Sequence, residues 1–353
     1  MRNNENENGS DAGNGSGIGF MRGLTGIRGR VQEVWSAAAN RLPLPKGSEN
    51  TPCDESEFLL LREDFGVAPG LAAAYEHCRK INAHYGKTYY FSSSFFPPDV
   101  RPAVHALYAW VRYPDEWVDN PNGLTIPEQA DKLRQWRDAT ADAIKTGSSD
   151  HPVLAAWADS ARRYEVPAKY MRDFLDAMEM DLTVSRYETF DDLQKYTYGS
   201  ASVVGLIMCR LVGCDDPASV SHATALGLGM QLTNFLRDVG EDFNGRGRIY
   251  LPLEDMARFG VTEDDIRRGT VTENVISLLR FEIARTREIY EHADAGVHYL
   301  PQYAQLPVRL ARVLYSRILD KIEQNRYDVF TKRARVPTWE KLVTLAVKQQ
   351  RGR

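Results

Sequence analysis

A chain of 353 residues can bury a large core, and 43% hydrophobic with 26% charged residues is ordinary for a soluble globular protein. The net charge of −4 gives no reason to expect nucleic-acid binding. The four cysteines form no C-x-x-C pair, which predicts free thiols and a reducing, cytoplasmic compartment. No apolar run reaches the roughly 20 residues that a membrane-spanning helix needs.

The first part of the chain differs in composition from the rest. Residues 1–19 are rich in Asn, Gly, Ser and Glu, which predicts disorder and does not fit a signal peptide. Over 20–42, apolar residues recur at helical spacing among arginines, and two interpretations stay open: an amphipathic helix on an anionic membrane, or an extension on the folded domain. Prolines over 43–52 are typical of a linker. We therefore expect a tail over 1–54 and one domain over 55–353.

The remaining chain is helical in pattern almost throughout. Apolar periodicity predicts helices over 67–80, 102–111, 127–146, 153–164, 168–182, 190–211, 220–239, 276–300, 308–331 and 339–349. The sequence shows no series of alternating β-branched runs closed by hairpin turns, and no period of 20–50 residues repeats. The pattern predicts an all-α domain, a single large helical bundle.

One helix face near the middle of the chain is rich in oxygen ligands. Gln231, Asn234, Asp238 and Asp242 fall within about a third of a helix circumference. Carboxylates one turn apart suit a hard divalent cation such as Mg²⁺. Arg246 and Arg248 follow among glycines and suit an anion, so the stretch predicts a metal–diphosphate site.

A second acidic face occurs earlier in the chain. Tyr108, Arg112, Asp115 and Asp119 share one helical stripe, with Glu116 beside them. Two such faces can meet across a bundle core, although solvated acidic helix faces remain the alternative on spacing alone. Proline precedes the first aspartate, where it marks either a kink or a helix start. Histidines show no zinc spacing and no Glu-x-x-His pair occurs, which leaves Mg²⁺ with a phosphorylated ligand.

Several motifs resemble the squalene/phytoene synthase family and occur in the family's order. They are Asp115-Glu-Trp-Val-Asp119, Tyr196-Thr-Tyr-Gly-Ser-Ala-Ser-Val-Val-Gly205, Asn234-Phe-Leu-Arg-Asp-Val-Gly-Glu-Asp242, Arg246-Gly-Arg-Ile-Tyr-Leu-Pro252 and Ala311-Arg-Val-Leu-Tyr315. The resemblance is strongest to the bacterial phytoene branch. It implies a helical bundle of the isoprenoid synthase type with a central cavity. The implied reaction joins two geranylgeranyl diphosphates head to head through prephytoene diphosphate, the first committed step of carotenoid biosynthesis.

The resemblance also assigns roles to individual residues. It implies metal ligation by Asp115, Glu116, Asp119, Asn234, Asp238 and Asp242. It implies diphosphate contacts from Arg112, Arg237, Arg246, Arg248, Lys87, Thr88, Tyr89, Gln231 and Lys332. The four aspartates would act in catalysis together with Tyr108, Tyr196 and Tyr315. Small residues such as Ala201 and Gly205, with Val204 and Met208, would line an apolar tunnel. Mg²⁺ is the implied cofactor, with Mn²⁺ as a substitute, and no NADPH is expected.

Other functions remain open from the sequence. A dehydrosqualene or squalene synthase acting on farnesyl diphosphate differs mainly in substrate length. A non-catalytic prenyl-lipid binding protein would not need the complete charged set. Class I terpene cyclases usually carry D-D-x-x-D, which is not present. The implied partners are prenyl diphosphates and carotenoid-pathway enzymes, with peripheral contact to the cytoplasmic membrane.

Overall fold

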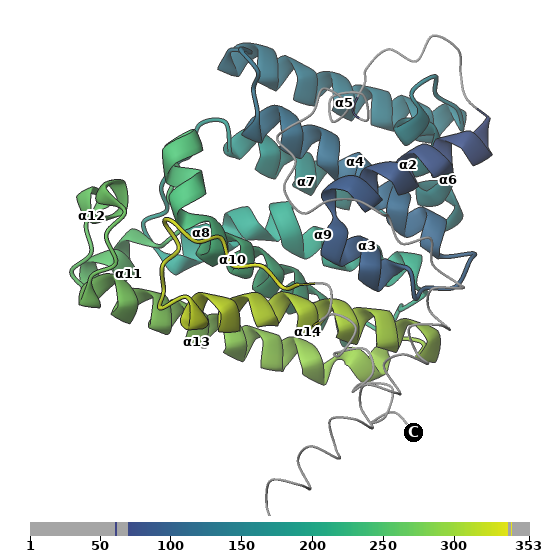
Figure 1. Ribbon diagram of the computed structural model, residues 1–353. Coiled ribbons are helices and arrows are strands. Elements are labelled where there is room, and N and C mark those ends of the chain that lie inside the picture. The colour runs from purple at the N-terminus through teal and green to yellow at the C-terminus, as the bar shows by residue number, and fades with distance from the viewer. Residues whose placement is uncertain (1–60, 62–69, 338–339, 341–353) are drawn as a thin grey trace, which may run out of the picture. The chain divides into compact units, whose positions relative to one another are not determined.

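The computed structural model describes residues 61, 70–337 and 340, which contain helices and no strand (Figure 1). The helices are α2 (Leu71–Tyr85), α3 (Lys87–Ser93), α4 (Arg101–Asp119), α5 (Ile126–Thr146), α6 (Pro152–Arg163), α7 (Ala168–Met180), α8 (Phe190–Thr197), α9 (Val203–Leu211), α10 (Ser219–Arg246), α11 (Leu253–Arg258), α12 (Glu263–Arg268), α13 (Glu273–Ala295) and α14 (Gln302–Gln324), with a π-helix at Tyr198–Ser202 and a 3₁₀ turn at Val297–Tyr299. The predicted all-α class is confirmed. The expected tail over 1–54 lies outside the described residues, as does the expected helix over 339–349 apart from Glu340.

Local sequence signals set the ends of several helices. At the start of α5, the Thr125 main-chain N–H and hydroxyl both donate to Glu128 Oε2 at 2.7 Å. Pro127 occupies the first turn, where main-chain N–H groups have no acceptor within the helix, so a residue without an N–H loses no hydrogen bond there. Gly147 ends the helix with φ of 80°, a left-handed conformation that glycine adopts without strain. These signals explain why the predicted bounds of this helix agree with the structure.

The α4 helix continues through Pro114 instead of starting or stopping there. The predicted helix over 102–111 was therefore too short, since α4 runs to Asp119. Proline removes one main-chain donor, but both Pro114 and its neighbour Tyr113 are buried, so packing offsets that loss. Both aspartates of the first acidic motif consequently lie on one continuous helix.

A π-helix interrupts the long helix that the sequence predicts over 190–211. It lies against α7 and α10. A side chain at Gly199 would approach the Asp173 carbonyl of α7 within 2.5 Å, and one at Gly205 would approach the Ala223 carbonyl of α10 equally closely. The small residues therefore allow close backbone packing on both sides, and π-helical turns of this kind often occur at functional sites.

Two hydrophobic cores hold the bundle together. The first lies among α2 and α4 to α7, where the buried Trp110 and Trp157 rings stack at 5.4 Å. The second joins the end of α10 to α13 and α14 through residues such as Leu278 and Leu319. In Figure 1, α13 and α14 run side by side along one edge, while α4 and α5 lie at the opposite edge. Helices α3, α9 and α10 lie between these groups and supply much of the cavity wall.

None of the described helices has the length and apolar character needed to cross a membrane. Cys78, Cys209 and Cys214 are free thiols, as the sequence predicts.

Candidate active site

The α4 stripe carries the first acidic motif. Arg112 lies between its two neighbours on this helix, because its Nη1 donates to Asp115 Oδ2 at 2.5 Å and its Nη2 donates to Glu116. Its guanidinium also lies over the Tyr85 ring, 4.7 Å from the centroid. Asp119, one turn further on, has no partner on its own helix among these contacts. The motif thus has one locally paired aspartate and one that faces the rest of the bundle.

The α10 stripe carries the second acidic motif. Arg237 forms a two-pronged contact with the adjacent Asp238, at 2.8 and 2.5 Å. One turn earlier, Asn234 Nδ2 lies 3.5 Å from Gln231 Oε1, and Gln231 lines the cavity. Asp242 completes the stripe near the end of the helix and is buried. The predicted oxygen-rich face is present on one helix, as the spacing requires.

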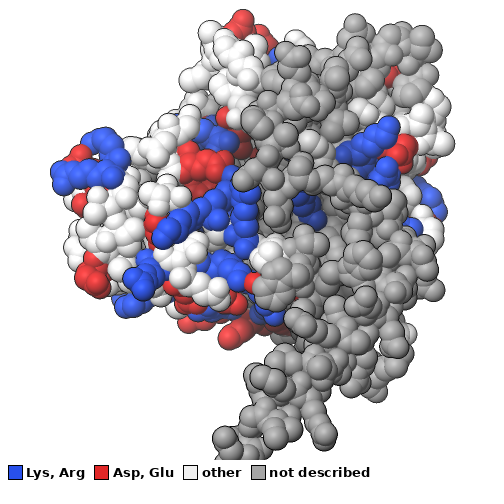
Figure 2. Space-filling view, viewed as in Figure 1, with Lys and Arg blue, Asp and Glu red and all other residues white. Residues whose placement is uncertain are grey.

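Two arginines join the acidic motifs. Arg246 Nη1 donates to Asp242 Oδ1 at 2.9 Å, and its Nε lies 3.3 Å from Asp119 Oδ1. Arg248 Nη1 donates to the same Asp119 oxygen at 2.8 Å. These contacts bring the ends of α4 and α10 together, so the two motifs do face each other. Figure 2 shows acidic side chains lying between Lys and Arg side chains on this face of the molecule.

The donor set of the four aspartates fits a divalent cation in its chemistry. Asp115, Asp119 and Asp242 each give one oxygen to an arginine, and the second oxygen receives no hydrogen bond from a described residue. Asp238 differs, because Arg237 and Arg333 together engage both of its oxygens. Within the described ranges, no three Asp, Glu, His or Cys side chains converge closely enough to hold a metal ion as they stand, so a cation would need some of these carboxylates to reorient. The carboxylates are therefore gathered around arginines, with three oxygens still open to a cation.

Burial and mutual repulsion act on the two inner aspartates. Burial raises the pKa of the Asp119 carboxyl to about 6, and the charge of Asp115 adds to this. Burial and then the Asp238 charge raise the pKa of the Asp242 carboxyl to about 7. Both shifts mean that the ionised carboxylates are disfavoured at these buried positions when no cation is bound. Perturbed carboxyls of this kind are typical of functional sites.

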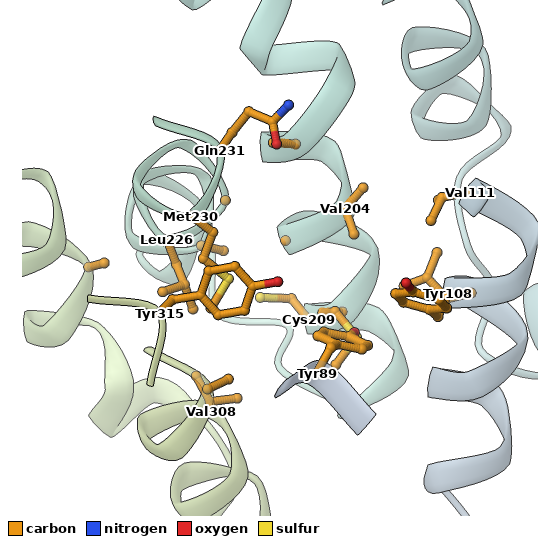
Figure 3. Close-up of a pocket in the computed structure, with 18 of the residues that line it drawn as sticks. Tyr89, Tyr108, Val111, Val204, Cys209, Leu226, Met230, Gln231, Val308 and Tyr315 are labelled. Atoms are coloured by element: carbon orange, nitrogen blue, oxygen red, sulfur yellow. The ribbon is translucent and has the colours of Figure 1, made fainter. Parts of the chain in front are cut away.

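A cavity of about 320 Å³ opens beside the acidic motifs. Its polar end includes Arg112, Asp115 and Gln231, whereas most of its wall is apolar. The predicted tunnel residues Ala201, Val204, Gly205 and Met208 all line it. In Figure 3, Gln231 and Val308 lie at opposite ends of the view, with a group of tyrosines between them. The cavity therefore connects a charged end with an apolar interior.

Three phenols converge on the middle of this cavity. The Tyr89 and Tyr108 rings stack at 5.6 Å, and Tyr315 faces them from α14 (Figure 3). The Tyr89 hydroxyl donates to Met208 Sδ at 3.1 Å. Burial raises the pKa of all three hydroxyls, so the phenols stay neutral at physiological pH. Their uncharged aromatic faces are suited to contact a cationic carbon chain.

Tyr196 also lines the cavity but is almost fully buried. Its ring stacks with Tyr250 at 5.8 Å, and Tyr250 in turn stacks with Phe235 at 4.1 Å. Tyr196 is the member of this aromatic layer that reaches the cavity, and Tyr250 behind it donates a hydrogen bond to the buried Asp181. Tyr196 is therefore held by its neighbours more tightly than the three phenols of the open cavity.

The remaining predicted residues lie further from the acidic motifs. Lys87 begins α3, is exposed, and forms no ion pair with a described residue, while the adjacent Thr88 carbonyl accepts a hydrogen bond from Ser92. The helix predicted over 308–331 is α14, which ends at Gln324, so Lys332 lies in an irregular segment after it, with its Nζ 3.7 Å from Asp328. Its neighbour Arg333 reaches Asp238 instead, at 3.2 Å.

Asp181 is a charged residue of this region that the sequence motifs did not indicate. It ends α7 and is 5% exposed. Its Oδ2 lies 3.1 Å from Arg248 Nη1, and its Oδ1 accepts a hydrogen bond from the Tyr250 hydroxyl at 2.7 Å. Asp181 belongs to neither acidic motif of the sequence, so only its position in the fold connects it to them.

Comparisons with known proteins identify the family of the chain. A phytoene synthase of Arthrospira platensis is 41% identical over 293 residues, covering 79% of this chain and 94% of that protein. A 15-cis-phytoene synthase of Synechococcus elongatus is 39% identical over 294 residues, covering 80% and 94%. The crystal structure of a dehydrosqualene synthase superposes with a TM-score of 0.73 at 26% identity, covering 80% and 98%. The squalene/phytoene synthase family matches residues 82–340, and the chain therefore belongs to that family.

Proposed function

We propose that this protein is a phytoene synthase, which joins two geranylgeranyl diphosphates head to head through prephytoene diphosphate and needs no NADPH. Sequence similarity carries the choice of product. Relatives named phytoene synthase are 41% and 39% identical to the chain, whereas the dehydrosqualene synthase of the same fold is 26% identical. A C30 product from farnesyl diphosphate is the second candidate, because it requires the same site with a shorter cavity.

The charged end of the cavity would hold the diphosphate groups. Arg112 on α4 and Arg237 and Arg246 on α10 are all partly exposed and offer planar donors for phosphate oxygens. The open oxygens of Asp115, Asp119 and Asp242 would ligate Mg²⁺, with Asp238, Glu116 and Asn234 completing or orienting the set. A bound Mg²⁺ would neutralise the charge that accumulates on the leaving diphosphate.

Arg248 has a different environment from the other arginines. It is buried, and its two terminal nitrogens donate to Asp119 and to the carbonyls of Val118 and Asp181. A guanidinium that is engaged in this way has little capacity left for a phosphate group. We infer that Arg248 orients Asp119 and does not contact the diphosphate.

The apolar part of the cavity would protect the reacting chains from water. An allylic cation that meets water is converted to an alcohol, so the wall of Val204, Met208 and their neighbours favours carbon–carbon bond formation. The faces of Tyr89, Tyr108 and Tyr315 would stabilise passing positive charge. Tyr196 would support this wall from behind. Diphosphate released into the charged end would accept the final proton, either directly or through one of the phenols, which would pass its own proton on to the diphosphate.

The test is to incubate purified protein with geranylgeranyl diphosphate and Mg²⁺ in the absence of NADPH. A C40 product with a conjugated triene spectrum is expected. Farnesyl diphosphate is the matched alternative substrate, and turnover of that substrate alone would reject the proposal in favour of a C30 synthase. Addition of a chelator should stop the reaction, and Mg²⁺ or Mn²⁺ should restore it.

We also infer peripheral contact with the cytoplasmic membrane, where other enzymes of carotenoid synthesis would collect the product. The support is chemical: substrate and product are long apolar chains that partition into lipid. Sedimentation of the full chain with anionic vesicles should show reversible, salt-sensitive binding. Complete recovery of the protein in the supernatant would contradict this inference.

A further inference from the structure

Asp181 connects two parts of the site that the acidic motifs alone do not connect. It follows the last residue of α7, whereas Asp119 ends α4. Arg248 spans the distance between them, because its Nη1 lies 2.8 Å from Asp119 Oδ1 and 3.1 Å from Asp181 Oδ2. One guanidinium nitrogen is thus shared between a motif aspartate and a buried aspartate outside the motif.

The second nitrogen of Arg248 fixes the plane of the guanidinium. Nη2 donates to the main-chain carbonyls of Asp181 at 2.9 Å and of Val118 at 3.3 Å. Both carbonyls belong to helix ends, where main-chain acceptors lack helical partners. Arg248 therefore has one orientation, and in that orientation it donates to Oδ1 of Asp119 while Oδ2 receives no hydrogen bond from a described residue.

A second branch leads from Asp181 to the cavity. The Tyr250 hydroxyl donates to Asp181 Oδ1 at 2.7 Å, and the Tyr250 ring stacks with Tyr196, which lines the cavity. A hydrogen bond to a buried carboxylate holds a tyrosine ring strongly in place. The same carboxylate thus orders one side of the acidic site and one side of the cavity wall.

We propose that Asp181 is a positioning residue for the reaction: through Arg248 it holds Asp119 in an orientation that leaves Oδ2 available to ligate a cation, and through Tyr250 it holds Tyr196 against the cavity. This inference rests on the proposed function, since it assumes that Asp119 binds a divalent cation. Groups that orient metal ligands in this way commonly change metal affinity or activity when they are replaced. Asp181 itself touches neither substrate nor cation.

Asp255 provides a matched control elsewhere in the protein. It is 4% exposed, and Arg285 donates to it at 2.8 and 3.3 Å, so it too is a buried aspartate paired with an arginine. It lies on α11 and does not line the cavity. Asp255→Asn should therefore disturb folding stability as Asp181→Asn does, without changing metal binding.

The test is a titration with Mn²⁺ in the presence of inorganic diphosphate, followed by electron paramagnetic resonance, on the full chain and both variants. Asp181→Asn should weaken Mn²⁺ binding by about 10- to 100-fold and raise the Mg²⁺ concentration needed for half-maximal rate. Asp255→Asn should bind Mn²⁺ within about two-fold of the parent protein. Equal weakening by both variants, or unchanged Mn²⁺ binding in Asp181→Asn, would overturn the proposal.

Tyr250→Phe keeps the inference testable if Asp181→Asn does not fold. It removes only the hydroxyl that donates to Asp181 and retains the stacked ring. A smaller change of about two- to five-fold in kcat, with KM unchanged, is expected because a single hydrogen bond is lost. Unchanged kcat in this variant counts against the proposal. The parent protein's product with geranylgeranyl diphosphate tests the proposed function separately, because Mn²⁺ binding is measured without turnover.

Discussion

The two acidic motifs share their spacing but differ in their surroundings. On α4, the Asp115 side chain is 45% exposed, and its one partner among the described residues, Arg112, lies on the same helix. On α10, the Asp238 side chain is 13% exposed, and Arg237 and Arg333 hold both oxygens. The α4 aspartate can therefore reorient toward an incoming cation, whereas the α10 aspartate is fixed. Equal sequence spacing does not give equal freedom to the two ligands.

The motifs become alike one turn further inward. Asp119 and Asp242 both contact Arg246, and burial raises the pKa of both carboxyls. Asp119 and Asp242, the inner pair, are thus linked to each other through one arginine. Asp115 and Asp238, the outer pair, each pair with an arginine of their own helix. Changes at the inner pair should have the largest effects and changes at the outer pair the smallest.

The largest effect is expected from Asp242→Asn. The substitution removes a charge and an open oxygen from the inner pair, so kcat with geranylgeranyl diphosphate should fall on the order of 10³-fold. Asp115→Asn should cost less, about 10²-fold, because the exposed Asp115 has neighbours that can compensate. Product formation measures both rates. Similar losses for the two variants would show that the inner and outer positions do not differ.

Arg248→Gln should give the largest loss of folding stability among the site variants. Arg248 is buried and serves Asp119, Asp181 and the Val118 carbonyl, so its loss leaves buried acceptors unpaired. We expect the free energy of unfolding to fall by about 3 kcal/mol in urea titrations. Arg246→Gln should cost about 1 kcal/mol, because Arg246 is more exposed. The reverse order would contradict the orienting role of Arg248.

The inner pair should also produce a pH dependence of stability in metal-free protein. Burial and the Asp238 charge raise the pKa of Asp242 to about 7, above the value of about 4 expected in the unfolded chain. Between these values the folded state binds a proton that the unfolded state does not, so the stability contributed by Asp242 falls as pH rises. The free energy of unfolding of the parent protein relative to Asp242→Asn should therefore decrease by about 3.5 kcal/mol from pH 4 to pH 7.5. A difference that stays constant, or rises with pH, would contradict the shift.

Local spacing explains why much of the site could be predicted. The stripes on α4 and α10 depend only on offsets of three and four residues, and Arg112 with Asp115 is such a pair. Long amphipathic helices such as α5 and α7 begin and end near their predicted residues, because their caps and apolar spacing are local. The short α3, α11 and α12 carry too few turns for a periodic signal and were missed.

Contacts between distant segments could not be predicted in the same way. The partners of Asp119 come from the end of α10, and its orientation depends on Asp181, which no motif marks. Arg248 was predicted to contact diphosphate, but burial turns its nitrogens toward protein acceptors. The partners of Asp119 and Arg248 depend on which helix ends lie close together in the fold. A single sequence carries no local signal for the proximity of distant helix ends.

The smallest effect is expected at the outer end of the α10 motif, where the sequence favoured Lys332. The structure brings Arg333 to Asp238 and Glu241, whereas Lys332, 63% exposed, lies near Asp328. Arg333 is itself 41% exposed, so Arg333→Ala should change stability by less than about 1 kcal/mol. It should raise KM for geranylgeranyl diphosphate about three-fold, because Asp238 loses one of its two arginines and the entering diphosphate loses a nearby positive charge. Lys332→Ala is the matched control, and a larger KM effect in that variant would favour the original sequence prediction over the arrangement seen at Arg333.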